Sequence, residues 1–507
     1  AAATGGAAAV SGSVTTNKLT TKTNSILEAD QVTANSVRVA TLNGTPADKN
    51  SIMSLAGSIT ASANAGFGAA VAVNQSEREF GANVNGTTFN GTTDLVVQST
   101  GASAVKTLAA SGGAGGSVSA GASNASSIGT NKISAKITDS HLNSAARVEV
   151  LATDGSTIDS LAGAVQAGGS GAVGVATAVN DLGTTLNAGV SGGSMDVTNL
   201  LVQGRSMTDI DTVAVGVSVG GSAGVSGSIV VNRINSSTKA AIDSGAIIHA
   251  DHNVGVLASS DDSINLGAGA IGISGATVGG AGSVTVNILE GETEAAIRGS
   301  NTVVVANAND NNDRVATTGG QLASNPTGNP FADFFSDGSS VDKPETSDFA
   351  GYVAPDLIGK QGSATGVVVD ALALQQTSSV IATAGISADF VSGVGIAAAV
   401  NTTVMGGSAR ALVEDATIGD TTNSTAAGDL TLAAGHHAYG TEVMLGAAAS
   451  SVGVVAAAGV STYSGEATAA IRDANVKIGG DINVDAFSRR DQLSVIAGVA
   501  VGSWAGV

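Results

Sequence analysis

The chain has no cysteine and is poor in proline, aromatic and basic residues. Its 507 residues include five Pro, one Trp, three Tyr and nine Phe. Without cysteine there is neither a disulfide framework nor thiolate chemistry. The chain has 21 Lys and Arg against 41 Asp and Glu, which gives a formal net charge of −20. Because phosphate contacts need clustered basic side chains, this balance disfavours nucleic acid and anionic membrane surfaces as partners.

A recurring phrase is the most informative feature that the chain does contain. A Gly/Ala/Ser run leads into an alternating Val-x-Val stretch that closes on asparagine, as in GFGAAVAVN and VSGSIVVN. Ser461 replaces the asparagine in one copy, and a degenerate copy ends at Asn124. We treat the closing asparagines as structural repeat anchors: Asn74, Asn180, Asn232, Asn287 and Asn401. Their spacing of roughly 55 residues is typical of repeat architectures.

Composition and periodicity predict an all-β fold. The 70 glycines disfavour helix, and the valines of the phrase recur at period two, as in a strand with one buried face. We expect Val231, Val286 and Val400 to point inward, and turns at Asn85-Gly86 and Asp154-Gly155. The prediction is an elongated parallel β-solenoid (β-helix) of roughly 55-residue repeats with one irregular insertion. If each repeat forms two or three coils, the rod is on the order of 70 to 120 Å long.

The repeats are interrupted once. We divide the chain into β-solenoid repeats at 1–308, a Pro/Asp/aromatic insertion loop at 309–363, and further repeats at 364–507. The start lacks a basic segment and an apolar core of the kind found in signal peptides, and the end falls part-way through a copy of the phrase. We therefore expect a piece of a longer protein, truncated at both ends. The uncharged stretch 443–460 shares the phase of the repeats, so we expect no membrane span within this segment.

A second motif follows the phrase in several copies. It appears as TKAAI ending at Ile242, TEAAI ending at Ile297 and ATAAI ending at Ile471, each before another alternating strand. The succession resembles the repetitive passenger regions of large bacterial filamentous adhesins of the autotransporter and two-partner secretion types, including leukotoxin-type filamentous adhesins. The resemblance covers nearly the whole chain except the insertion. It implies a β-solenoid exported to the bacterial cell surface, and it carries over no catalytic residue.

Motifs that suggest cofactors or metals are weak here. Gly169-x-Gly171-x-x-Gly174 and Gly267-x-Gly269-x-x-Gly272 match a dinucleotide fingerprint, but the expected following segment is a strand rather than a helix. We assign no cofactor to them. The pair His436-His437 would point to opposite faces of a strand, so we expect two solvated histidines at a strand end and no metal.

Oxygen-bearing side chains alternate where the repeats break off. Asn307, Asn309, Asn311 and Asp313 resemble the beginning of a calcium loop, although the central Gly and the closing Glu of that motif are missing. We keep these four residues as a weak calcium candidate. The alternative interpretation of these residues is an Asp/Asn-rich turn at which the chain leaves the solenoid.

The insertion concentrates aromatic residues among aspartates. Exposed aromatics with polar neighbours are typical of binding surfaces. The alternative is a flexible excursion that binds nothing, or aromatics that fold back onto the rod. The candidate partner-binding residues are Phe331, Phe334, Phe335, Phe349 and Tyr352.

Three functions fit this pattern. The first is an extracellular, non-enzymatic fibrous surface protein, a rigid β-solenoid stalk that mediates adhesion to a cell-surface or glycan ligand. The second is a self-associating structural filament or sheath subunit, whose partners are copies of itself. The third is a polysaccharide-acting β-helix enzyme, which needs carboxylates converging on one groove. Asp159, Asp211 and Asp262 recur at similar repeat phases, so we expect a solvated acidic stripe instead of a catalytic centre.

Overall fold

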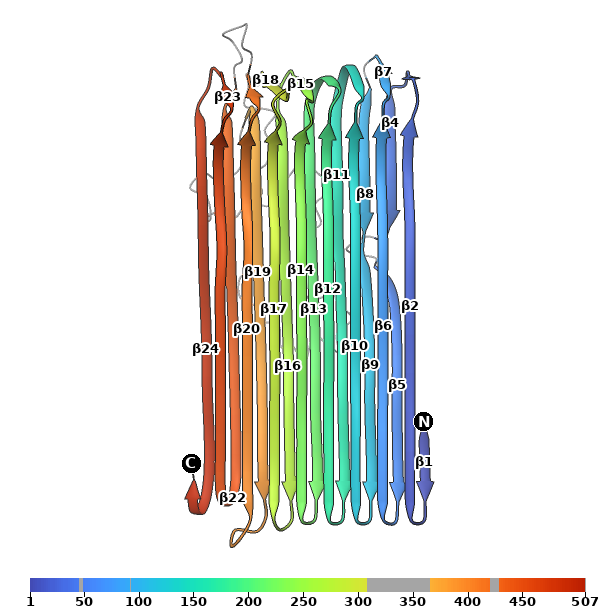
Figure 1. Ribbon diagram of the computed structural model, residues 1–507, viewed down its shortest axis with the longest axis vertical. Helices are drawn as coiled ribbons and strands as arrows, with labels where there is room; N and C mark the ends of the chain where they lie inside the picture. The colour runs from blue at the N-terminus through green and yellow to red at the C-terminus, as the bar shows by residue number, and fades with distance from the viewer. Residues whose placement is uncertain (45–48, 92, 308–364, 420–427, 507) are drawn as a thin grey trace.

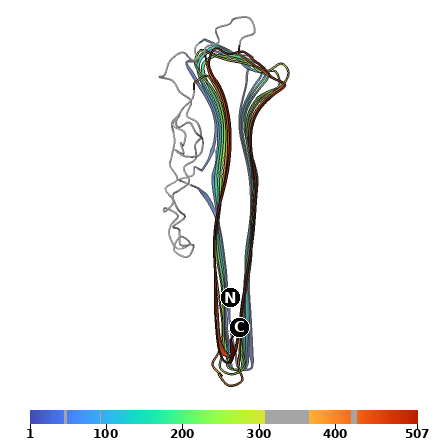
Figure 2. The ribbon, with the colours of Figure 1, turned by 90° about the vertical axis from the view of Figure 1, so that its left-hand side faces the viewer.

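The computed structural model is an all-β solenoid in the residues that it describes, which are 1–44, 49–91, 93–307, 365–419 and 428–506. Its paired strands are parallel, and they place successive coils in register on one another. Each coil runs up one wall of a slab and down the other (Figures 1 and 2). The predicted fold class is confirmed.

Long strands form the two walls. The strands of the first wall are β2 (Ala8–Glu28), β6 (Ala65–Asn85), β10 (Val118–Thr138), β12 (Gly171–Ser191), β14 (Ala223–Asp243), β17 (Val278–Arg298) and β20 (Val394–Glu414). Those of the second wall are β1 (Ala2–Gly5), β4 (Ser36–Asn43), β5 (Asn50–Ser62), β8 (Asp94–Gly101), β9 (Ser103–Gly115), β11 (His141–Gly168), β13 (Ser194–Gly220), β16 (Val254–Ser274), β19 (Val367–Ser387) and β24 (Ile482–Gly506). The first part of β22 (Leu430–Arg472) pairs in the second wall and its last part in the first wall.

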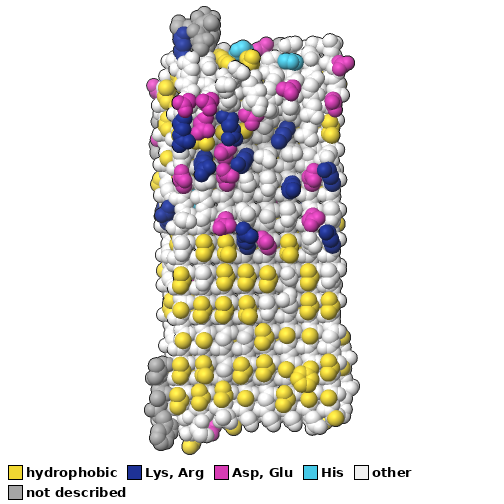
Figure 3. Space-filling model, in the orientation of Figure 1, with side chains coloured by type: hydrophobic (Ala, Val, Ile, Leu, Met, Phe, Trp, Pro, Cys, Tyr) yellow, Lys and Arg dark blue, Asp and Glu magenta, His cyan; other side chains and the backbone are white. Residues whose placement is uncertain are grey.

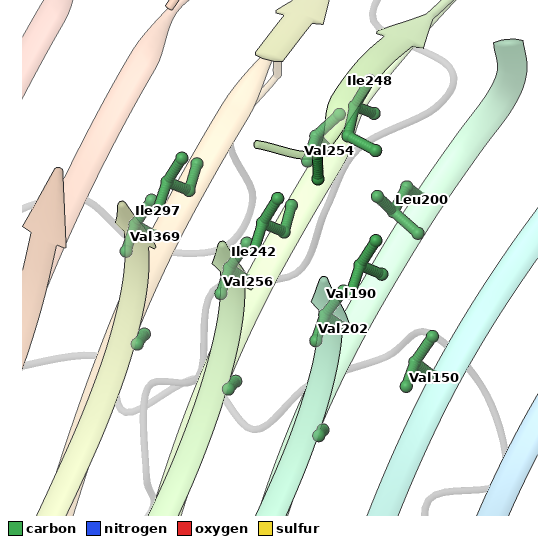
Figure 4. Close-up of a cluster of buried hydrophobic side chains, with 14 of the residues drawn as sticks. Val150, Val190, Leu200, Val202, Ile242, Ile248, Val254, Val256, Ile297 and Val369 are labelled. Atoms are coloured by element: carbon green, nitrogen blue, oxygen red, sulfur yellow. The ribbon is translucent and has the colours of Figure 1, made fainter. Parts of the chain in front are cut away.

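A short third side closes the coil at its wide end. It consists of β3 (Gln31–Val32), β7 (Thr88–Asn90), β15 (Ile247–Ala250), β18 (Val303–Ala306), β21 (Thr417–Ile418) and β23 (Asn475–Val476), with the first residues of β11 and β13. The walls separate here and meet at the opposite end, which we call the narrow end (Figure 2). Branched side chains such as Val190, Ile242 and Ile297 stack in register and fill the wide end (Figure 4).

One repeat makes one coil, which corrects the expectation of two or three. Asn180 of β12 pairs directly with Asn232 of β14, and Asn232 pairs with Asn287 of β17. Eight stacked strands at about 4.8 Å span only ~34 Å, whereas a 21-residue strand at about 3.3 Å per residue spans ~70 Å. The long axis of the molecule therefore lies along the strands, not along the solenoid axis (Figure 1).

The valines of the phrase face outward, contrary to our prediction. Val400 is 40 % exposed, and Val231 and Val286 are half-buried on the outer surface. Their neighbours Val230 and Thr285 are fully buried instead. The reason is the short distance between the walls near the narrow end, which leaves space mainly for the Ala, Ser and Gly of each phrase.

Glycine permits the tight turns at both ends of the coil. At the narrow end a Cβ on Gly220 would lie 1.8 Å from the carbonyl oxygen of Ala223. At the wide end Gly86 has a φ of +57°, which confirms the predicted Asn85-Gly86 turn. The prediction for Asp154-Gly155 is wrong, since both residues lie inside β11.

The insertion begins and ends at the same corner of a coil. Ala306 at the end of β18 pairs with Ala250, and Val367 at the start of β19 pairs with Val254. The same corner in the preceding coil is bridged by residues 251–253. The ladder on either side of the insertion is thus that of an ordinary coil.

Candidate functional site

Most of the predicted site residues lie outside the described part of the chain. These are Asn309, Asn311, Asp313, Phe331, Phe334, Phe335, Phe349 and Tyr352. Asn307 is described and exposed, and its backbone N–H donates to the carbonyl oxygen of Ala250 at 3.0 Å. Within the described ranges no group of three or more His, Asp or Glu side chains could hold a metal ion. The calcium candidate stays a prediction.

The repeat anchors form a buried amide ladder between the walls. The Asn180 side-chain amide donates to Oδ1 of Asn232 at 2.9 Å, and the Asn232 amide donates to Oδ1 of Asn287 at 3.1 Å. Thr212, on the second wall, donates to the same Oδ1 of Asn232 at 2.9 Å. In the same way, the hydroxyl of Ser54 on the second wall donates a hydrogen bond to Oδ1 of Asn74 at 2.6 Å. The asparagines therefore hold the walls together and fix the register of successive coils.

Two positions at the irregular copies differ from our alignment, whereas Ser461 agrees with it. Ser127, not Asn124, pairs with Asn74 and Asn180 in the degenerate copy. Asn401 is buried but pairs with Thr285, and Thr403 stands opposite Asn287. Thr403 in turn pairs with Ser461, so that serine does occupy a ladder position. Sequence spacing alone missed the two-residue offset in β20.

A second polar layer lies deeper toward the wide end. Asp154 of β11 is fully buried and accepts hydrogen bonds from Ser156 at 2.8 Å and Thr184 at 3.2 Å. Burial raises the pKa of this carboxyl to about 6, against the lowering effect of those hydroxyls. The neutral acid is thus the form that the interior favours at acid pH.

Asp262 of β16 repeats this arrangement two coils further along the stack. It accepts hydrogen bonds from Ser236 at 2.6 Å and from Thr208, and it is fully buried. Desolvation raises its pKa to about 7, with smaller contributions from nearby Asp261 and Asp209. Our sequence analysis missed Asp154 and misplaced Asp262. The alternation of side chains along a strand could have shown that both carboxyls face inward. Asp154 lies four residues from the buried Ile158, and Asp262 lies two residues from the buried Ile264, so each shares the inward face of its strand.

Two basic side chains share this layer. Arg78 is buried and donates to the carbonyl oxygens of Ala102 at 3.1 Å and Asn50 at 3.3 Å. His436 is also fully buried, and desolvation, with a smaller effect of Arg490, lowers its pKa to about 4. Gly465 leaves the space for its ring, since a Cβ there would lie 2.2 Å from it.

The histidine pair is therefore not solvated as we expected. His437 is only 2 % exposed, and its Nε2 lies 3.1 Å from Oδ2 of Asp491 on β24. Burial lowers the pKa of His437, and the Asp491 contact opposes that shift. The two rings point to opposite faces of β22, as adjacent strand residues must.

The expected acidic stripe is incomplete. Asp159 and Asp211 pair with each other across β11 and β13. The Asp159 carboxylate forms an ion pair with Nζ of Lys106 at 3.3 Å, and the Asp211 carboxylate accepts a hydrogen bond from the side-chain amide of Asn265 at 2.9 Å. Asp262 is not part of this row, because it pairs with Thr208 and faces inward. The three carboxylates do not converge on one groove.

The outer surface of the first wall divides into two halves. Toward the wide end it carries cross-strand ion pairs, including Lys22 with Glu79 at 2.6 Å and Lys239 with Glu292 at 2.9 Å. Toward the narrow end it carries rows of apolar side chains (Figure 3). Exposed cross-strand pairs of this kind contribute on the order of 0.2–1 kcal/mol each.

The remaining sequence motifs are parts of the solenoid. Gly171 and Gly174 lie in β12, and Gly267, Gly269 and Gly272 lie in β16, so strand follows both dinucleotide matches. Residues 443–460 belong to β22. A helix long and apolar enough to cross a membrane does not occur in the described ranges.

Taken together, the titratable groups of the interior are sealed from solvent, and the accessible chemistry is on the outer surface. A hollow of about 240 Å³ lies between the two walls at the last coil and is lined by Val455, Ala457, Ile496, Gly498 and Ala500, which pair with inward residues of the preceding strands. No family model, curated protein or solved structure matches the chain.

Proposed function

We propose that the chain is a segment of an extracellular, non-enzymatic fibrous protein of the bacterial cell surface, a rigid β-solenoid stalk that mediates adhesion. The observation that carries the proposal is the unbroken register on both sides of the insertion. Ala306 and Val367 pair with Ala250 and Val254 as though the intervening residues were absent. A rigid scaffold with one long segment at its corner suits display of a binding loop.

The composition of the insertion favours an uncharged ligand. Its aromatics supply apolar contact area, and its aspartates would repel anionic surfaces. We therefore propose a neutral glycan of a cell surface as the ligand class. The residues that would contact it are Phe331, Phe334, Phe335, Phe349 and Tyr352.

Deleting the insertion tests this function. Removal of residues 309–363 leaves five residues between Ala306 and Val367, compared with three at the same corner of the preceding coil. We expect the variant to fold and to melt within a few degrees of the parent, because the flanking strands keep their ladder partners. Binding to an array of neutral oligosaccharides should disappear.

Two substitution variants separate recognition from folding. Replacing the five aromatics of the insertion with serine should also abolish glycan binding. The matched control is Phe390→Ser, because Phe390 is 51 % exposed in the turn at the opposite end of the coil. Glycan binding that survives both the deletion and the fivefold substitution would refute the proposed role of the insertion.

A further inference from the structure

Charge is excluded from the part of the slab between the asparagine ladder and the narrow-end turns, which we call the narrow half. Residues 107–131, 212–232 and 263–289, which pass through it, contain no Asp, Glu, Lys or Arg. Among the described residues the exceptions are Asp389, in the turn between β19 and β20, and the buried carboxyl of Glu442, which lies at the level of the ladder beside Gly459.

The outer face of this half carries branched side chains, whereas its interior is filled mainly by small ones. In β14 the inward positions are Gly224, Ser226, Ser228 and the fully buried Val230, whereas Val225 and Ile229 face outward and are 42 % and 43 % exposed. Branched side chains left in water on a sheet face are typical of an interaction surface. We call the outward side chains of the first wall in the narrow half the valine face.

The valine face is corrugated across the strands. The ladder register aligns two mostly branched rows with a row of mainly Gly and Ala between them. The first branched row contains Val10, Phe67, Val173, Val225 and Ile396, and the second contains Val14, Val71, Ile229, Val284 and Val400. The intervening row contains Gly12, Ala69, Ala122, Gly227, Gly282 and Ala398. The rows cross the lower half of Figure 3.

The area suffices for a stable pair of molecules. Eight strands at about 4.8 Å and ten residues at about 3.3 Å give a face of roughly 1,100 Å². A specific protein interface buries about 800 Å² on each partner. The ridges and the small-residue row provide the complementarity that packed sheets need.

We propose that two copies of this chain pair through their valine faces. A two-fold axis places one branched row of each copy against the small-residue row of the other. The charged halves remain in water, so the interface buries no ion pair. This pairing goes beyond the adhesive role and does not depend on it.

A lipid bilayer is the other apolar occupant, and the structure disfavours it. Contact with fluid lipid chains does not require the alternating ridges and grooves of the valine face. Insertion of the narrow end would also carry Asp389 deepest into the hydrocarbon, where a carboxylate is costly. This side chain is exposed, and hydrogen bonds from Ser392 and from backbone amides lower its pKa, so it stays ionised.

Sedimentation of two matched variants tests the pairing. Val225→Lys places a charge on the valine face, and Asn235→Lys places the same charge ten residues along β14, on the outer face of the charged half. We expect the parent and Asn235→Lys to be dimers at micromolar concentration. Val225→Lys should weaken association at least 100-fold and leave the circular dichroism spectrum unchanged, because position 225 is on the surface.

A flotation assay with vesicles of neutral phosphatidylcholine completes the test. The proposal predicts that the dimeric parent does not float with them. A parent that is monomeric at all concentrations overturns it, whether or not it binds vesicles. Equal association of the two lysine variants also overturns it, since the contact would then lie elsewhere.

Discussion

At the scale of single residues, the interior is held by polar side chains whose partners lie on the opposite wall or in a neighbouring coil. Asp262 takes its two hydroxyl donors from β13 and β14. Its burial would be costly for a charged carboxylate, and the raised pKa shows that the fold favours the protonated form. The acid therefore makes the stability of the solenoid depend on pH.

The sign of that dependence follows from proton binding. Between about pH 4 and pH 7 the carboxyl of Asp262 is ionised in the unfolded chain but protonated in the fold. The folded state binds more protons, so its stability falls as the pH rises through this window, by on the order of 4 kcal/mol. Asp154 adds to the fall up to about pH 6. His436 opposes it, because its neutral form is favoured and stability is lost as the pH drops from 6.5 toward 4.

Substituting Asp262 isolates its contribution. Asp262→Asn keeps the shape and removes the ionisation, so we expect a flatter profile of unfolding midpoint against pH and a more stable protein than the parent at pH 8. The control is Asp181→Asn on the outer face of β12, which should follow the parent. Unfolding profiles of the parent and Asp262→Asn that stay parallel from pH 4 to pH 8 would contradict this account.

At the scale of elements, each coil depends on turns that stack directly on those of its neighbours. The narrow end is made of short Gly- and Ser-rich turns that are hydrogen-bonded from one coil to the next. For example, the backbone N–H of Ser222 donates to the carbonyl oxygen of Ser170 in the preceding coil at 2.7 Å. Such a turn cannot relax without disturbing the turns above and below it.

Two glycine substitutions measure this constraint. Gly220→Ala should destabilise the fold by about 1–3 kcal/mol, since the new methyl group meets the carbonyl oxygen of Ala223. In β11 a Cβ on Gly163 meets no atom within 4 Å, so Gly163→Ala should be neutral or slightly stabilising. Chemical denaturation of both variants gives the comparison. Equal midpoints would show that the turns adapt and that their stacking is not rigid.

Sequence reasoning identifies the strands and the parallel solenoid, because these follow from period-two alternation and repeat spacing. It fails on which face is buried. Alternation defines two faces, and we assigned the inner one to Val231 and Val286 on hydrophobicity, whereas the close approach of the walls selects the small residues. It also misses the buried carboxyl of Asp154, whose hydroxyl partner Thr184 lies 30 residues away.

At the scale of the whole molecule, the slab has an interior of branched apolar side chains at its wide end and of mainly small side chains in its narrow half, where the outer surface is apolar. Both walls share this surface, as Val165 and Val219 on the second wall show by their exposure of 58 % and 44 %. The self-pairing role, as proposed, uses this exposed apolar surface.

The orientation of the side chains in the narrow half is the central claim, and thiol labelling tests it most directly. The chain has no cysteine, so an introduced one is unique. Ala164 and Val165 are adjacent in β11, on the wall opposite the valine face, and Ala164 is fully buried. We predict that Val165→Cys reacts with a maleimide under native conditions at a rate near that of the unfolded chain, and that Ala164→Cys is protected at least 100-fold. Protection of Val165→Cys with reaction of Ala164→Cys would contradict the account.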